Sequence, residues 1–172
     1  MCAGGNQGIG YETAKNLLLF SSSYHVVLGS RDLANGIDAV SSLQKLPIKG
    51  TVETIQIDVT DDASVDTAAT KLGATLGRLD VLVNNAGIGA RHNHSARDAM
   101  REVLAVNVVG VVSVTEAFLP LLRKSSAPRL IFVSSTTGSI TVAADPTGPL
   151  RGEGAMDYRS SKAALNMLMV LY

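Results

Sequence analysis

The sequence predicts an α/β domain with a doubly wound parallel sheet and helices on both of its faces. Short apolar runs rich in β-branched residues alternate with longer segments of helical spacing, and a glycine-rich turn opens the chain. Strands that alternate with helices form right-handed βαβ units, which cover both faces of a parallel sheet. With 172 residues, 46% of them hydrophobic, we expect residues 1–172 to form a single domain.

The apolar patterns place each element along the chain. Strands are expected at 26–28, 52–57, 81–83 and 130–133, and helices at 10–20, 33–46, 63–76 and 98–122. Short polar side chains that can cap a helix stand before the third helix, at Thr60-Asp61-Asp62, and before the fourth, at Ser95. Residues 136–156 carry several glycines and prolines without an apolar period, so we expect a long loop there.

Charge and cysteine content limit the classes of partner. A formal net charge of +0 provides no field to attract nucleic acid or an anionic membrane, so a small molecule or another protein is the expected partner. The single cysteine, Cys2, excludes an intrachain disulfide, and no Cys or His spacing is typical of a metal site; we predict a cytoplasmic protein without a metal. Polar residues and Pro120 interrupt the apolar window 103–122, which indicates a buried helix and not a membrane span.

The opening turn has glycines at 4, 5, 8 and 10. Glycine permits a tight turn and close approach of a pyrophosphate, and the helix N-terminus behind it offers free N–H groups and a positive partial charge. A dinucleotide is therefore the implied ligand. The spacing differs from G-x-G-x-x-G, so an ordinary tight turn is an equal alternative on this motif alone.

Polar residues follow the expected strands at 26–28 and 52–57. Arg31 could pair with a 2′-phosphate, which favours NADP, and Asp32 could accept from a 2′-hydroxyl, which keeps NAD as an alternative. A solvated Arg31 beside a helix-capping Asp32 is the structural alternative. Asp58 could accept from the adenine amino group or cap the helix that starts near Ala63.

Two further groups of residues could bind a ligand or take part in a reaction. In Asn84-Asn85-Ala86-Gly87 the amides could tie strand ends together while the small residues leave room for a ribose, although an ordinary turn uses the same residue types. Tyr158 and Lys162 share one helix face, where an ammonium would stabilise a phenolate. Because Tyr-x-x-x-Lys also occurs by chance in helices, this pair alone does not establish catalysis.

Taken together, AGGNQGIG, NNAG, a helical Asn107, VSS at 133–135 and YRSSK resemble the short-chain dehydrogenase/reductase family, which uses NAD or NADP on a Rossmann-type sheet. The resemblance implies a cofactor turn at Gly4, Gly8, Ile9 and Gly10, a 2′-phosphate contact at Arg31, an adenine contact at Asp58, and cofactor contacts at Asn85, Ala86 and Gly87. It further implies Tyr158 as general acid/base, Lys162 as ribose anchor, Asn107 as proton relay and Ser135 as the catalytic serine, with Ser134 as second choice.

Three features depart from the family pattern. Gln7 stands where NADP-preferring relatives often have a basic residue, and the spacing from Ser135 to Tyr158 is unusually long. Both ends look cut: we expect an incomplete first strand with a gap at the centre of the sheet, and no C-terminal strands beyond Tyr172, hence a partial NAD(P)-binding domain.

The expected function is that of an NADP-preferring oxidoreductase acting on a carbonyl or secondary alcohol. The alternatives are a non-catalytic dinucleotide-binding or interaction module and an inactive fragment. Self-association into a homodimer or homotetramer is expected through the helices that begin near Val103 and Tyr158.

Overall fold

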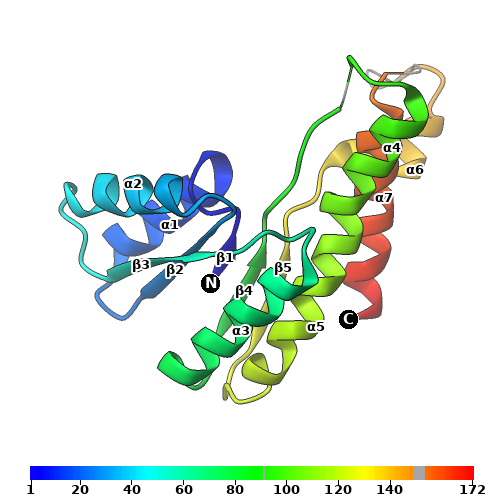
Figure 1. Cartoon of the computed structure of the whole chain (residues 1–172). Helices are drawn as coiled ribbons and strands as arrows, with labels where there is room; N and C mark the ends of the chain where they lie inside the picture. The colour runs from blue at the N-terminus through cyan, green and yellow to red at the C-terminus, as the bar shows by residue number, and fades with distance from the viewer. Residues whose placement is uncertain (91, 149–153) are drawn as a thin grey trace.

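The computed structural model of the chain describes residues 1–90, 92–148 and 154–172. Within them, five parallel strands form one sheet in the order β3-β2-β1-β4-β5 (Figure 1). The strands are β1 (Cys2–Ala3), β2 (His25–Ser30), β3 (Thr51–Gln56), β4 (Val81–Asn84) and β5 (Arg129–Phe132). The helices are α1 (Gly8–Phe20), α2 (Leu33–Gln44), α3 (Asp62–Leu76), α4 (Ala96–Leu104), α5 (Gly110–Leu122), α6 (Ile140–Ala144) and α7 (Met156–Leu171), with a π-helical turn η1 (Ala105–Val109) and a 3-10 turn η2 (Thr136–Gly138). The doubly wound parallel sheet predicted from the sequence is confirmed.

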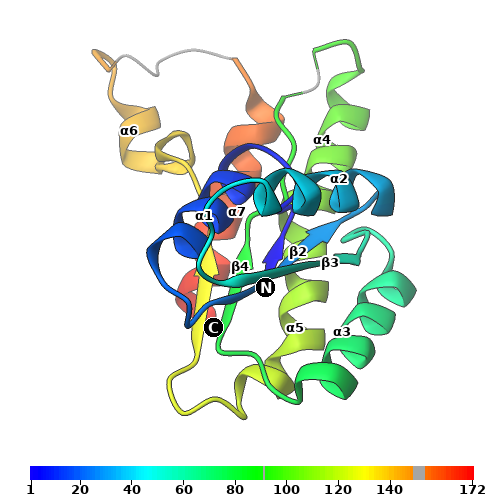
Figure 2. The same ribbon diagram turned by 90° about the vertical axis from the view of Figure 1, so that its left-hand side faces the viewer.

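Two hydrophobic clusters cover the two faces of the sheet. In β2, Val26 and Leu28 pack with Leu43 of α2 in one cluster, whereas Val27 between them belongs to a second cluster with Phe118 of α5. This alternation follows from the two-residue repeat of a strand. Figures 1 and 2 accordingly show α1 and α2 on one side of β2 and β3, and α3 on the other.

The central strand β1 is short but paired on both sides. Cys2 lies opposite Leu28 of β2 and Val83 of β4, and the Met1 backbone exchanges hydrogen bonds with β4 through the amide of Val83 (2.9 Å) and the carbonyl of Val81 (2.8 Å). The first strand is incomplete, as predicted, but the expected gap does not open at the carboxyl edge, where residues 1–3 connect β2 to β4. This edge is the one from which the glycine turn departs.

The helix expected at 98–122 is a continuous helical stretch with a π-helical turn in its middle. Among the described residues, Ala96–Leu122 is also the one stretch long and apolar enough to span a membrane by length and composition. However, Val114 and Phe118 of α5 are buried in the cluster under the sheet. The stretch therefore serves as a core helix of the domain, as predicted for residues 103–122.

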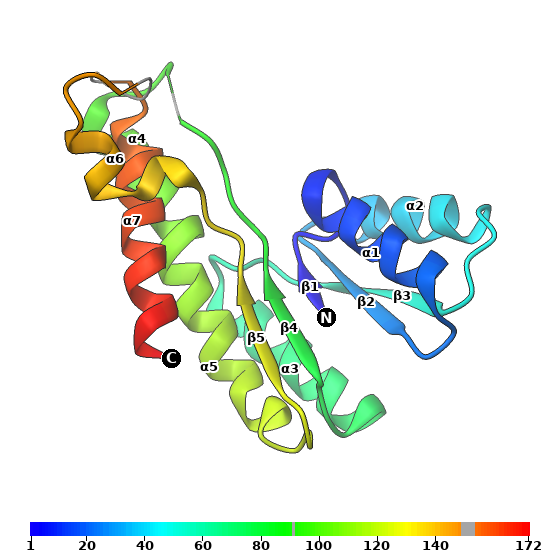
Figure 3. The ribbon, with the colours of Figure 1, turned by 180° about the vertical axis from the view of Figure 1, so that it is seen from behind.

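The long loop expected at 136–156 is wrong in its first part, which forms η2 and α6. Two serines start these turns: the Ser135 hydroxyl accepts from the amide of Thr137 (3.2 Å), and the Ser139 hydroxyl accepts from that of Val142 (3.3 Å). These side-chain caps stabilise helical turns in a segment whose sequence has no apolar period. Residues 149–153 lie outside the described part of the chain. Beyond them α7 runs alongside α4 (Figures 1 and 3).

Candidate active site

A cleft of about 540 Å³ lies at the carboxyl edge of the sheet. Its volume is within the range of small-molecule sites, roughly 300–1,000 Å³. It is lined by residues from the glycine turn, from the ends of β2 to β5 and from α7. The predicted site residues among them are Gly4, Gly8, Ile9, Arg31, Asp58, Asn85, Ala86, Gly87, Ser134, Tyr158 and Lys162. Gly10, Asn107 and Ser135 do not line the cleft. They could therefore act on a ligand only through neighbouring residues or after their side chains or backbone move.

The glycine turn is shaped by close approach of the backbone. Gly4 has φ +69°, and a Cβ at this position would lie 2.8 Å from the Cα of Ala86. A Cβ at Gly10 would lie 2.5 Å from Nδ2 of Asn85 and 2.6 Å from the carbonyl oxygen of Gly4. Side chains at either position would therefore push the turn away from the end of β4.

The start of α1 faces the cleft without a side-chain cap. The residue before the helix, Gln7, makes no capping hydrogen bond, and Gly8 and Ile9 at the first positions of α1 both line the cleft. The first amides of a helix have no partner within the helix, and they carry the positive end of its dipole. This arrangement suits a phosphate group.

Asn84 and Asn85 tie the end of β4 to its surroundings, as the sequence predicted. The Asn85 amide donates to the carbonyls of Gly4 (2.7 Å) and Ala3 (3.3 Å), and the Asn84 amide donates to the hydroxyl of Thr115 (2.9 Å). Asn85 therefore holds the glycine turn against β4. Its contact with a ligand stays a prediction.

Of the two charged residues after β2, Asp32 has a structural partner. Its carboxylate caps α2 by accepting from the amides of Ala34 (2.8 Å) and Asn35 (3.4 Å), which is the structural alternative considered for it. Arg31 is exposed and lines the cleft. At this end of the cleft the guanidinium is thus the charged group best placed for a ligand.

Asp58 lines the cleft and does not cap α3. Its Oδ1 accepts from the hydroxyl (2.7 Å) and the amide (2.9 Å) of Thr60, whereas Asp61 caps α3. Partial burial opposes ionisation of Asp58, but the Thr60 hydrogen bonds and the nearby Arg31 charge outweigh it and hold the pKa of this carboxyl below its ordinary value. Asp58 is therefore an ionised acceptor at neutral pH.

Tyr158 and Lys162 both lie on the cleft side of α7. The Lys162 Nζ is 5.6 Å from the centre of the Tyr158 ring and donates to the carbonyl of Val133 (2.8 Å) at the end of β5. Burial lowers the pKa of Lys162 below its ordinary value. The hydrogen bond to Val133 uses one of the three ammonium protons, and the other two remain to be donated within the cleft.

The two serines after β5 differ in their surroundings. Ser134 donates to Oδ1 of Asn166 on α7 at 2.6 Å, whereas the Ser135 hydroxyl is 2.9 Å from that of Thr137. Ser134 thus fastens β5 to α7. Ser135 is half-buried at the start of η2, and its hydroxyl is bound locally.

Asn107 is buried within η1, where its side chain is fully hydrogen-bonded. It donates to the carbonyl of Ile88 (3.0 Å) and the hydroxyl of Ser161 (2.9 Å), and it accepts from the amide of Ile88 (2.9 Å). Sequence reasoning missed Ser161 and Asn166. A signal for Ser161 was available, because a serine three residues after Tyr158 can bond back to that carbonyl on a helix.

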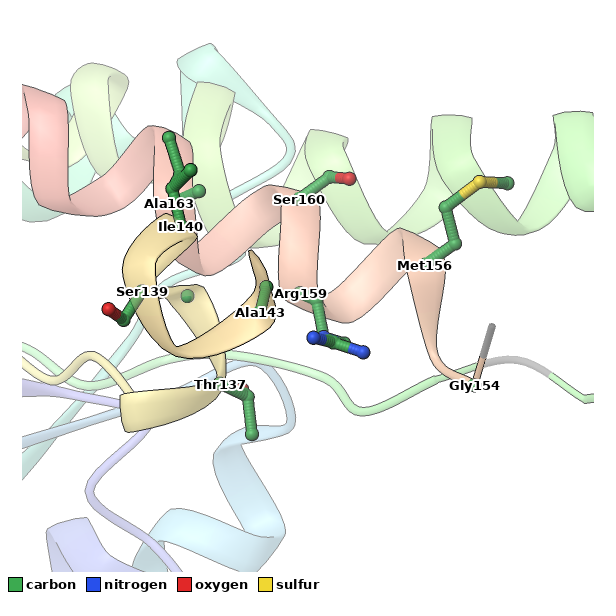
Figure 4. Close-up of a pocket in the computed structure, with 10 residues that line it drawn as sticks. Thr137, Ser139, Ile140, Ala143, Gly154, Met156, Arg159, Ser160 and Ala163 are labelled. Atoms are coloured by element: carbon green, nitrogen blue, oxygen red, sulfur yellow. The ribbon is translucent and has the colours of Figure 1, made fainter. Parts of the chain in front are cut away.

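A second cavity, of about 640 Å³, lies on another face of α7 (Figure 4). It is lined by Thr137, Gly138, Ser139, Ile140 and Ala143 from the region of η2 and α6, and by Gly154, Met156, Arg159, Ser160 and Ala163 from the region of α7. None of the residues predicted for catalysis or cofactor binding lines this cavity. The candidate active site is therefore the cleft beside the glycine turn.

The strand order, the glycine turn at the start of α1 and the polar strand ends define a dinucleotide-binding α/β domain. The family model for short chain dehydrogenases matches residues 1–171, and the chain belongs to this family.

Similar proteins agree with this assignment. The short-chain dehydrogenase/reductase tropE of Talaromyces stipitatus is 39% identical, with 99% of this chain and 69% of the relative covered. Salutaridine reductase of Papaver bracteatum is 34% identical, with 96% and 64% covered. Among solved structures, NADPH-bound carbonyl reductase from chicken fatty liver matches with a TM-score of 0.81 and 34% identity, covering 96% of this chain and 69% of that one. The RhlG/NADP complex of Pseudomonas aeruginosa matches with a TM-score of 0.80 and 33% identity, covering 96% and 62%. The chain thus spans about two thirds of the length of these proteins.

Proposed function

We propose that this chain carries the cofactor and catalytic residues of an NADP-preferring oxidoreductase that interconverts a carbonyl and a secondary alcohol. The observation that supports it best is the composition of one cleft, which brings Arg31 and the glycine turn together with Tyr158 and Lys162. These residues come from opposite ends of the sequence. Their convergence provides a dinucleotide site with an acid/base pair beside it.

The residues present fit an NADP cofactor. The glycine turn leaves the backbone space that a pyrophosphate needs, and Arg31 offers a cation for a 2′-phosphate while Asp32 is engaged as a helix cap. Lys162 would donate to the ribose hydroxyls. Two of the similar solved structures are complexes with NADPH or NADP, which supports the same choice. NAD is the alternative.

The chemistry follows from the groups at the Tyr158 end of the cleft. Bound NADPH would supply a hydride to the carbonyl carbon. Tyr158 would donate its hydroxyl proton to the carbonyl oxygen as negative charge develops, and Ser135 would hydrogen-bond the same oxygen. The Lys162 ammonium, 5.6 Å from the Tyr158 ring, would stabilise the phenolate that remains. Alcohol oxidation runs the same steps in reverse.

Tyr158→Phe tests the catalytic role. We expect the purified protein to oxidise NADPH with members of a carbonyl panel, and the variant to lose turnover by about 100-fold or more, because a positioned proton donor contributes roughly 10²–10⁴-fold. The affinity for NADPH should be retained because the ring stays in place. Unaltered turnover in the variant would contradict the proposed role of Tyr158.

Arg31→Ser tests the cofactor preference separately. Loss of a charged hydrogen bond costs about 1.5–3 kcal/mol, so NADPH affinity should fall by roughly 10-fold or more while NADH affinity stays unchanged. Calorimetric titration of both cofactors measures this difference. Equal losses for the two cofactors would show that Arg31 does not contact the 2′-phosphate.

One observation favours a second candidate, a dinucleotide-binding module without turnover. The Ser135 hydroxyl is bound to Thr137 and does not line the cleft. NADPH binding in calorimetry without oxidation by any carbonyl of the panel would support this candidate. Rearrangement of Ser135 on substrate binding is what the oxidoreductase proposal requires.

For the chain's assembly and location, we propose a homo-oligomer in the cytoplasm. Large apolar side chains on α7 are exposed, among them Met167, Met169, Val170 and Leu171. Several exposed large apolar side chains on one helix are consistent with an interface. Sedimentation of the purified protein tests the oligomer, since a monomer at all concentrations would contradict it.

A further inference from the structure

A buried hydrogen-bonded chain links the loop after β4 to the start of α7. Asn107, 1% exposed, bonds to both backbone groups of Ile88 and donates to the Ser161 hydroxyl. Ser161, 0% exposed, donates in turn to the carbonyl of Tyr158 at 2.7 Å. The chain therefore runs from a residue that lines the cleft to the backbone of the proposed acid/base.

The hydrogen bonds fix the direction of each group in this chain. The Ile88 amide is a donor, so it must face the oxygen of Asn107, and both protons of the Asn107 amide are then directed to Ile88 and Ser161. Ser161 accepts from Asn107, so its own proton goes to Tyr158. Each buried polar group of the two side chains has a partner, and a fully satisfied network of this kind rigidifies its surroundings.

We infer that Ser161 is a positioning residue that sets the place of Tyr158 relative to the cleft. The inference rests on the proposed function. Ile88 lines the cleft beside Gly87, and a Cβ at Gly87 would lie 3.2 Å from Oδ1 of Asn107 and 3.7 Å from Nζ of Lys162. The backbone of Ile88 in the cleft and the Tyr158 backbone are thus held in one geometry through Asn107 and Ser161.

A role in positioning differs from a role in binding. Ser161 lies behind Tyr158 and does not line the cleft, so its loss should leave cofactor and substrate affinity in place. Small displacements of a reacting group lower the rate of the chemical step strongly, by up to about 100-fold for 1 Å. The expected signature is a fall in kcat without a matching change in KM or in the Kd for NADPH.

The test is Ser161→Ala with the exposed neighbour Ser160→Ala as matched control. In Ser161→Ala we expect kcat to fall about tenfold while KM and the Kd for NADPH stay within about twofold, because only positioning is lost. The backbone amide of Ile88 should exchange its hydrogen faster, because Asn107 loses an acceptor and moves. Ser160→Ala should change neither kcat nor the exchange rate of the Ile88 amide. If Ser161→Ala gives no cooperative melt, Ser161→Cys, which keeps a heavy atom at the γ position but is a weak hydrogen-bonding group, is measured in its place.

A double-mutant cycle with Asn107→Ala completes the test. Because Asn107 reaches Tyr158 through Ser161, the two side chains act as one unit, and the double variant should lose little more kcat than Asn107→Ala alone. Additive losses, or a kcat for Ser161→Ala equal to that of Ser160→Ala, would overturn the inference in a protein that turns over. A wild-type protein that oxidises NADPH with no carbonyl would instead overturn the proposed function, and this inference with it.

Discussion

Replacing Gly10 by alanine should open the contact between the glycine turn and β4. A Cβ at this position would lie 2.5 Å from Nδ2 of Asn85 and 2.6 Å from the carbonyl oxygen of Gly4. These two atoms are themselves hydrogen-bonded at 2.7 Å. The new methyl group would therefore enter the space between a donor and its acceptor, and one of them would have to move.

The expected cost follows from three contributions. Displacing Asn85 leaves partly buried polar groups unpaired, at about 1–3 kcal/mol, and forcing backbone apart adds about 1–3 kcal/mol. Alanine in α1 returns up to about 1 kcal/mol through its higher helix propensity. The net loss is about 1–6 kcal/mol, with about 3.5 kcal/mol at the midpoints, and that central value lowers Tm by roughly 7–14 °C for a domain of this size.

Thermal unfolding followed by circular dichroism measures this change, and Gly73→Ala in α3 is the matched control. A Cβ at Gly73 would meet only the Leu121 side chain, at 3.4 Å, an ordinary contact distance. The control should therefore gain about 0.5–1 kcal/mol from helix propensity. A melting temperature for Gly10→Ala equal to that of the wild type would contradict the role of the Asn85 hydrogen bond in holding the glycine turn against β4.

Three further predictions concern single side chains. Lys162→Met should weaken NADPH binding by about tenfold or more, through loss of charged hydrogen bonds, while Tm stays nearly level because removal of a buried charge offsets the lost hydrogen bond to Val133. Since burial lowers the pKa of Lys162, the wild type loses stability as pH falls from the unfolded pKa through the folded one, and the variant should lack this dependence in denaturant titrations. Burial raises the pKa of the Cys2 thiol to about 11, so a disulfide reagent at mildly alkaline pH should label it only after unfolding, and rapid labelling of the native protein would contradict its placement in β1. Asp61→Ala should lower Tm by roughly 2–4 °C through loss of a cap worth about 1 kcal/mol, with Asp66→Ala of the same helix as an unchanged control.

The sequence predicted the sheet and its helices because their signals are local. Apolar runs and capping residues such as Asp61 and Ser95 mark where elements begin, and the structure confirms both caps. The helical turns in the first part of residues 136–156 could not be predicted in the same way. There Ser135 and Ser139 start turns too short to show an apolar period.

Within the cleft, residue types could be predicted but their partners could not. The motifs pointed to Arg31, Tyr158 and Lys162, and all three line one cleft. The hydrogen bond from Lys162 to Val133 and that from Ser134 to Asn166 join residues far apart in the chain, and they depend on how α7 packs against β5. Tertiary contacts of this kind leave no periodic signal in a sequence.

Side-chain hydrogen bonds between neighbouring segments fix the shape of the cleft, although one of its strands is very short. β1 contributes two residues to the sheet, yet the turn that follows it is fixed by the Asn85 amide, which reaches the carbonyls of Ala3 and Gly4. On the opposite wall, Ser134 joins β5 to α7, and Asn107 joins α7 to the loop after β4 through Ser161. Because these bonds join strand ends, the loop after β4 and α7 to one another, the geometry of the cleft depends on a few amides and hydroxyls. Substitutions there should disturb ligand binding and turnover before they unfold the two hydrophobic clusters, which lie on the faces of the sheet.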